Sequence, residues 1–120
     1  PKGGPGMREM FKAMKFMYGA GLSKTCALIT DGRFSGTNNG CFVGHISPEA
    51  AEGGPLAIVK DGDEILIDVN EGKLELHVSD EEIKERFKTW KRPEKPIPNG
   101  YLRLYSKVAS SADKGAIIEN

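Results

Sequence analysis

Apolar side chains recur at helical spacing in three parts of the chain. The first set predicts a helix over 7–18 with its methionines in the core: Met7, Met10, Phe11, Met14 and Met17. A capping box at 79–82 begins a second helix, whose apolar stripe is Ile83, Phe87 and Trp90. The third predicted helix covers 101–109 and has on one side Leu102, Tyr105 and Val108.

Between these helices the pattern changes to short apolar runs and to strict alternation. The run at 25–30 predicts a buried strand, the run at 41–46 predicts a second strand, and 56–59 is a further apolar run in the β region. Alternation at 65–69 and 74–78 predicts strands with one wet face. Ser47 and Pro48 are expected to cap and open a short helical turn. We therefore expect an α/β fold rich in short strands, in which a closed or half-closed barrel hides the strand edges.

Composition narrows the function classes. The 120 residues suit one domain, and 17 basic residues balance 17 acidic ones. This neutrality argues against a dedicated nucleic-acid binder, and no apolar run approaches the roughly 18–20 residues of a membrane helix. The opening residues 1–6 resemble no signal peptide and include no Met, so a fragment or a processed product is expected. Cys26 and Cys41 lack metal-site spacing, so we expect small buried apolar residues, which suit a reducing cytoplasm.

Two glycine-rich segments carry residues with chemical potential. Glu9 follows the loop 3–6 at a predicted helix start, where it either complements the helix dipole or provides a carboxylate to Mg²⁺. The loop 31–40 follows a buried strand and brings Asp31, Arg33 and Ser35 within five residues. That loop is either ordinary or a ligand loop whose glycines let backbone amides approach a ligand. The spacing around Ser35 does not match a hydrolase elbow.

The remaining candidates favour structural roles. His45 ends an apolar run and is expected to be a hydrogen-bonded structural histidine, and Glu49 sits early in a helical turn that it would cap. His77 alternates onto the polar face of a strand and is expected to be solvated.

Three motifs resemble the carboxy-terminal region of the dihydroxy-acid/6-phosphogluconate dehydratase family. They are Lys2-Gly3-Gly4-Pro5-Gly6-Met7, Leu28-Ile29-Thr30-Asp31-Gly32-Arg33-Phe34-Ser35-Gly36 and Gly44-His45-Ile46-Ser47-Pro48-Glu49-Ala50. Segments 53–55, 61–63 and 110–116 follow in the family's order, so the resemblance covers almost the whole chain. It implies that residues 1–120 form a swivelling β/β/α domain, with a β-barrel-like core flanked by helices, and that the cluster-binding amino-terminal domain lies elsewhere.

The resemblance also implies roles for single residues. Ser35 resembles the family's catalytic serine, which takes a proton from C2 of the substrate, and Glu9 resembles the Mg²⁺ ligand of this domain. The loop or substrate supports would be Asp31, Arg33, Gly36 and Thr37. Residues 37–39 depart from the family's commoner glycine-containing version. The second implied cofactor is an iron–sulfur cluster, whose ligands belong to the amino-terminal domain.

Within the family, the stretch 44–49 without a preceding insertion is similar to the branched-chain amino-acid enzyme. That resemblance implies a hydro-lyase that dehydrates 2,3-dihydroxy-3-methyl acids to 2-keto acids in valine and isoleucine biosynthesis. Its expected partners are the amino-terminal domain of the same enzyme, a small dihydroxy acid and a second copy in a homodimer, with no nucleic acid and no membrane. The expected location is cytoplasmic, or organellar in a eukaryote, and the isolated domain is expected to be inactive. Two alternatives stay open: a dehydratase of sugar acids such as an aldonate or 6-phosphogluconate, and a stand-alone swivelling domain without chemistry.

Overall fold

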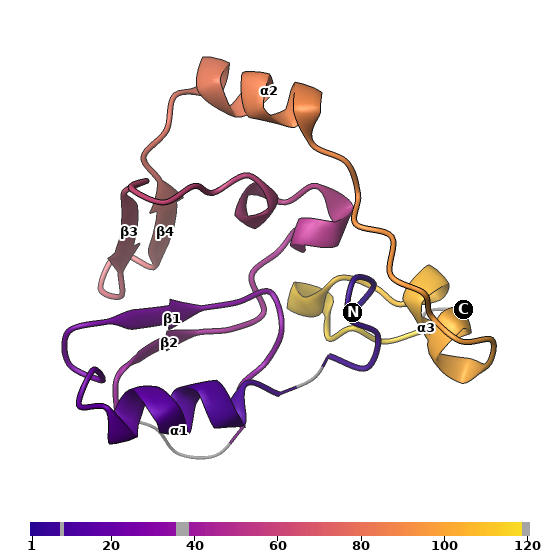
Figure 1. Cartoon of the computed structure of the whole chain (residues 1–120), viewed down its shortest axis with the longest axis horizontal. Helices are drawn as coiled ribbons and strands as arrows, with labels where there is room; N and C mark the ends of the chain where they lie inside the picture. The colour runs from indigo at the N-terminus through magenta and orange to yellow at the C-terminus, as the bar shows by residue number, and fades with distance from the viewer. Residues whose placement is uncertain (8, 36–38, 119–120) are drawn as a thin grey trace.

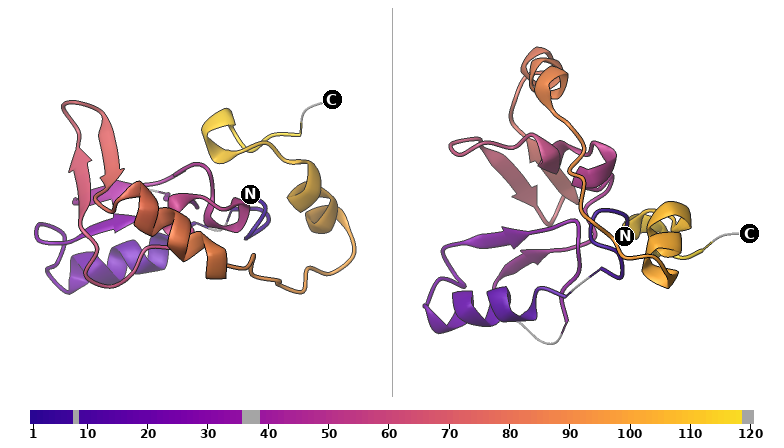
Figure 2. Two further views of the ribbon diagram at one scale, coloured as in Figure 1. Left: turned by 90° about the horizontal axis from the view of Figure 1, so that it is seen from above. Right: turned by 45° about the vertical axis from the view of Figure 1, so that its right-hand side comes forward.

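The computed structural model describes residues 1–7, 9–35 and 39–118 of the chain. Helix α1 (Phe11–Gly19) lies next to a parallel pair formed by β1 (Ala27–Ile29) and β2 (Cys41–Val43) (Figure 1). An antiparallel hairpin of β3 (Ile65–Asp68) and β4 (Lys73–Leu76) precedes α2 (Asp80–Thr89). Helix α3 (Tyr101–Val108) lies beside the amino-terminal loop, far from the hairpin, as both views of Figure 2 confirm. Three short 3-10 turns complete the order: η1 (Ala50–Glu52), η2 (Pro55–Ala57) and η3 (Ala112–Lys114).

Strands in the described part of the chain form two separate sheets of two strands each. In one sheet Leu28 pairs with Phe42, and in the other Ile67 pairs with Leu74. Neither sheet closes on itself. The swivelling β/β/α arrangement with a barrel-like core therefore stays a prediction.

The helices obey local rules, but the first begins later than its apolar stripe predicts. At α2 the Ser79 hydroxyl accepts a hydrogen bond from the Glu82 amide at 3.2 Å, as the capping box predicts. α1 ends at Gly19 as expected, yet it starts at Phe11 rather than Met7. Gly6 and Met7 have φ angles of 87° and 47°, so the chain is left-handed there and the helix cannot extend back through it.

Two predictions for residues 47–59 are wrong. Ser47 and Pro48 do not cap and open the helical turn, because Glu49 is still extended and η1 begins at Ala50. The first amide of η1 donates instead to the carboxylate of Asp31, 19 residues earlier, at 2.7 Å. The run 56–59 is not a strand either, because Pro55 opens the 3-10 turn η2 with the Ala57 amide bonded to Gly54 O at 2.9 Å.

Helix α2 is tied to the turn before β3 by one ion-pair network. The Arg86 guanidinium donates two hydrogen bonds to the Asp63 carboxylate, at 2.5 and 2.9 Å, and Nε donates to Glu82 at 2.8 Å. The Arg86 hydrogen bond, helped by the amide of Lys60, lowers the pKa of Asp63 to about 2. This network joins the hairpin region to the helix that follows it.

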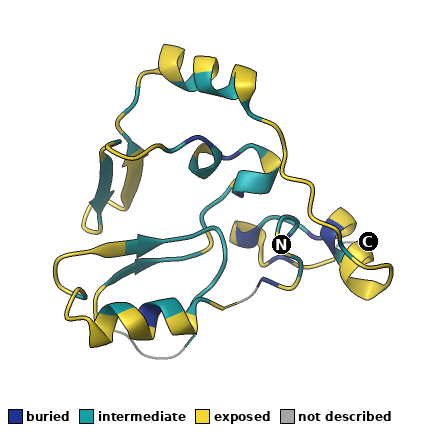
Figure 3. Cartoon of the chain, viewed as in Figure 1, coloured by how far each residue is buried: buried dark blue, intermediate teal, exposed yellow. Residues whose placement is uncertain are grey.

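Few side chains are fully enclosed (Figure 3). In α1 the core residue is Met14, 2% exposed, whereas Met7 packs apart from it in a cluster with Ala112 and Ala116. The chain exposes 8514 Å², and a compact monomer of 13.0 kDa would expose about 6,300 Å². Its radius of gyration is 15.5 Å, against about 13.6 Å for a compact domain of this length. The fold is thus open, and the chain exposes more surface than a compact domain of the same size.

The two cysteines differ from their predicted environment. Cys26 is exposed, because it lies in the turn before β1, and Cys41 is half-buried at the start of β2. The prediction that both are buried is therefore wrong for Cys26. No helix among the described residues is long and apolar enough to cross a membrane.

Candidate functional site

Glu9 and the Ser35 loop lie next to each other although they are far apart in sequence. Glu9 forms an isolated parallel bridge with Arg33, and the Met10 amide donates to the Arg33 carbonyl at 2.8 Å. Ser35 follows Arg33 by two residues, and Glu9 is exposed just before α1. The structure therefore brings the backbones of the two predicted catalytic segments together.

Ser35 is placed by the aromatic residue before it. Phe34 packs against Phe42 of β2, with ring centroids 5.6 Å apart, and a Cβ at Gly44 would lie 3.3 Å from Phe34 Cδ2. Ser35, the next residue along the chain, is half-buried. Gly36 and Thr37, the other predicted residues of this loop, lie outside the described residues.

Asp31 and Arg33 have different surroundings. The Asp31 carboxylate accepts from the Ala50 amide at 2.7 Å, so its role in the fold is to join the loop to η1. Arg33 is half-buried, and its Nε is shielded from solvent without a hydrogen-bond partner among the described residues. Asp31 thus joins the loop to η1, while the Arg33 side chain leaves one donor uncommitted among the described residues, and the supporting roles of both in the site stay predictions.

Glu49 makes the contact that sequence reasoning missed. Its side chain is buried, and its two oxygens accept from the Lys2 amide at 2.8 and 3.1 Å and from the Gly3 amide at 2.9 Å. It does not cap its own turn by a side-chain hydrogen bond. The signal in the sequence was an acidic residue inside one of the three motifs, but its partners lie 46 and 47 residues away.

Among the described residues, neither histidine ring forms a hydrogen bond with the Glu9 segment, the Ser35 loop or Glu49. His45 is exposed with a φ of 57°, and its backbone amide donates to Gly32 O at 2.9 Å. The prediction of a hydrogen-bonded structural ring is wrong in this respect, since the backbone makes the bond. His77 is exposed as predicted, 3.9 Å from carboxylates of Glu64 and Glu75.

The donor set of the described residues suits one of the two implied cofactors and not the other. Residues 1–7, 9–35 and 39–118 contain no group of three or more His, Cys, Asp or Glu that gathers to hold a metal ion. One exposed carboxylate, Glu9, fits Mg²⁺, which commonly takes one or two protein carboxylates beside water and substrate. Two cysteines without a third ligand beside them do not fit an iron–sulfur cluster, which needs about four protein ligands.

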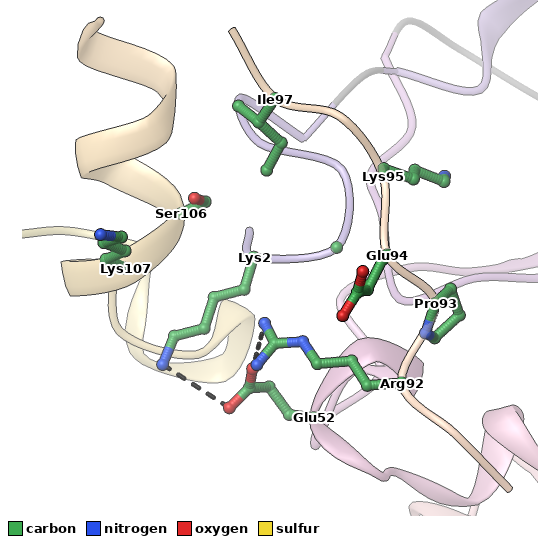
Figure 4. Close-up of a pocket in the computed structure, with 10 residues that line it drawn as sticks. Lys2, Glu52, Arg92, Pro93, Glu94, Lys95, Ile97, Ser106 and Lys107 are labelled. Carbon is green, nitrogen blue, oxygen red and sulfur yellow. Dashed lines mark ion pairs between the residues drawn. The ribbon is translucent and has the colours of Figure 1, made fainter. Parts of the chain in front are cut away.

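A hollow of about 550 Å³ opens elsewhere, between the amino-terminal loop, the connector before α3 and α3 itself (Figure 4). The Glu52 carboxylate lies between two cations there, 3.7 Å from Lys2 Nζ and 2.9 Å from Arg92 Nη2. Neither Ser35 nor Glu9 lines this hollow. The predicted catalytic residues thus lie outside this hollow.

Comparison with known proteins identifies the family. Residues 1–116 match the family described as dihydroxy-acid/6-phosphogluconate dehydratase, C-terminal. The dihydroxy-acid dehydratases of Thermodesulfovibrio yellowstonii and Acetivibrio thermocellus are each 58% identical, over 119 and 120 residues, or 99% and 100% of this chain. That of Ignicoccus hospitalis is 53% identical over 99% of the chain. In each case the chain spans 22% of the relative's length. The chain therefore belongs to the carboxy-terminal dihydroxy-acid/6-phosphogluconate dehydratase family.

Proposed function

We propose that these residues are the carboxy-terminal domain of an iron–sulfur hydro-lyase that converts 2,3-dihydroxy-3-methyl acids into 2-keto acids for valine and isoleucine biosynthesis. The observation that carries the proposal is the bridge between Glu9 and Arg33, which sets the proposed Mg²⁺ ligand beside the loop of the proposed base. The relatives named above are dihydroxy-acid dehydratases, which supports this substrate class over sugar acids.

In this proposal Ser35 accepts the proton from C2 of the substrate. The electrons of the C2–H bond form a C2–C3 double bond as the 3-hydroxyl departs, and the enol then moves its hydroxyl proton to C3. The proton taken by Ser35 and the departing hydroxide together make the water that is lost. Serine is a weak base unless positive charge stabilises its alkoxide, and Arg33 brings a guanidinium to this loop.

Glu9 is the residue of this chain that would hold Mg²⁺. When bound, Mg²⁺ supplies positive charge to the substrate carboxylate and 2-hydroxyl. The described cysteines do not fit an iron–sulfur cluster, so its ligands are proposed to lie in the amino-terminal domain. The group that assists departure of the 3-hydroxyl is proposed to belong there too.

The proposed partner is that amino-terminal domain. The chain exposes about 2,200 Å² more than a compact monomer of its mass, which is the size of a substantial interface. Apolar side chains of α3 contribute to this surface, since Tyr101 is 67% exposed and Leu104 54% exposed. A homodimer and a cytoplasmic location, organellar in a eukaryote, complete the proposal, and the isolated domain would be inactive.

The test uses the full-length protein, purified without oxygen and supplied with Mg²⁺. It should form a 2-keto acid from 2,3-dihydroxy-3-methylbutanoate and turn over D-gluconate and 6-phosphogluconate far more slowly. Ser35→Ala should lower kcat by about 100- to 10,000-fold, the usual contribution of a catalytic base. The control is Ser79→Ala, which removes a helix cap far from the loop and should retain kcat.

Three results would count against the proposal. Preference for a sugar acid would overturn the substrate class. An active Ser35→Ala variant would show that Ser35 is not the base. Turnover by the 120-residue chain alone would show that no second domain is needed.

A further inference from the structure

We propose that Glu49 is a positioning residue of the site, whose buried carboxylate holds the loop that leads to Glu9 in the shape that metal binding needs. The inference rests on the proposed function, in which Glu9 binds Mg²⁺. It assigns to Glu49 neither contact with substrate nor contact with the metal.

The carboxylate of Glu49 is buried against one loop. Glu49 is 6% exposed, and its recorded side-chain hydrogen bonds come from the amides of Lys2 and Gly3. The nitrogen of Pro1 lies 3.4 Å from Oε2 as well. A buried carboxylate is costly without such donors, so the contact strongly favours the one loop shape that presents both amides.

The same loop approaches η1 closely at Gly3. A Cβ added to Gly3 would lie 2.5 Å from Ala51 Cβ and 3.5 Å from Glu49 Oε2. A Cβ added to Gly4 would meet nothing within 4 Å. The loop therefore rests on η1 at the residue whose amide Glu49 binds, and only glycine fits there without displacement.

The turn at Glu49 and Ala50 also holds the Ser35 loop. The Ala50 amide, next to Glu49, donates to Asp31 at 2.7 Å, and Asp31 begins the segment that contains Ser35. Beyond the Lys2–Gly3 contact, the loop is held again where Met7 enters the cluster with Ala112 and Ala116. Glu9 follows this anchor and itself forms the bridge to Arg33. One turn thus sets the relative position of both segments.

Glu52 provides the matched control within that turn. Its carboxylate pairs with the side chains of Lys2 and Arg92 rather than with loop amides, as Figure 4 shows. Removing it deletes two ion pairs of the same region and leaves the loop backbone contact in place. A general loss of local stability would appear when either Glu49 or Glu52 is removed. A positioning effect would appear only when Glu49 is removed.

The experiment measures Mn²⁺ affinity by electron paramagnetic resonance, and hydrogen exchange of the loop amides, in the full-length protein. Glu49→Ala should weaken Mn²⁺ binding about tenfold or more and speed exchange at Lys2 and Gly3. Glu49→Gln should stay within about threefold of wild type, because one oxygen at the Oε2 position can accept from both amides. Glu52→Ala should leave both readouts unchanged.

Gly3→Ala disturbs the same contact from the loop side, and it replaces Glu49→Ala in the experiment if that variant does not fold. It should weaken Mn²⁺ binding as Glu49→Ala does, and the double variant should be no worse than either alone. Unchanged Mn²⁺ affinity in Glu49→Ala, an equal loss in Glu52→Ala, or additive losses in the double variant would each overturn the positioning role. Wild-type protein that binds Mn²⁺ but dehydrates none of the tested acids would refute the proposed function and leave these binding readouts intact.

Discussion

Gly54 is the position where a single methyl group should do most damage. The residue is buried in ordinary extended backbone, with φ −66° and ψ 159°, so only space limits it. A Cβ there would lie 1.8 Å from the Pro48 carbonyl oxygen and 2.6 Å from its carbon. An ordinary carbon–oxygen contact is about 3.3 Å, so Gly54→Ala must push backbone from backbone by about 1.5 Å. That displacement would also stretch the bond from the Gly54 amide to Glu49 O, now 3.0 Å.

The expected loss of stability is that of overpacking, about 1–3 kcal/mol. We expect the upper end of this range, because the clash involves the backbone of both segments rather than a side chain that could rotate away. If local opening governs exchange, the amides of Glu52 and Gly54, which both donate to Glu49 O, should exchange about 5- to 150-fold faster. Hydrogen exchange followed by mass spectrometry measures this in the full-length protein. Gly4→Ala is the control, since its added methyl group meets open space. Equal exchange in Gly54→Ala and wild type would refute the packing argument.

Two further predictions concern stability. The pKa of Asp63 is lowered from 3.8 to about 2 by Arg86, so its carboxylate stabilises the fold above about pH 4 and that contribution is lost as pH falls towards 2. Asp63→Asn should therefore lower the melting temperature at pH 7 and flatten its decline over this acid range; identical pH profiles of melting temperature would contradict this. Met14→Ala should cost about 2–5 kcal/mol in a urea titration, because Met14 is 2% exposed. Phe16→Ala, in the same helix at 77% exposure, should change the unfolding free energy by less than about 0.5 kcal/mol, and similar losses in both would argue against the assignment of Met14 to the core.

Local features of the fold could be predicted because their causes lie within a few residues. The capping bond from Glu82 to Ser79 spans three positions, and α3 occupies Tyr101–Val108, within one residue of its predicted range. The motifs that identify the family are also contiguous and can be read without coordinates. The start of α1 was the exception, because the left-handed backbone at Met7 depends on more than the spacing of apolar residues.

The sequence named candidate residues for the site, but it did not predict their arrangement. Glu9, Asp31 and Ser35 were named from their motifs, whereas the bridge from Glu9 to Arg33 and the bond from Ala50 to Asp31 appear only in three dimensions. Its position in the sequence favoured Glu49 as a cap of its own turn and gave no sign of its contacts with the amides of Lys2 and Gly3.

The sequence by itself determined the helices, the turns rich in glycine and the family. Only the tertiary structure decided that Glu49 is buried against amides 46 and 47 residues away, that Cys26 is exposed, and that Met7 packs with Ala112 and Ala116. The physical reason is range. Helical periods and caps depend on neighbours within about four residues, whereas burial depends on which distant segment covers a side chain.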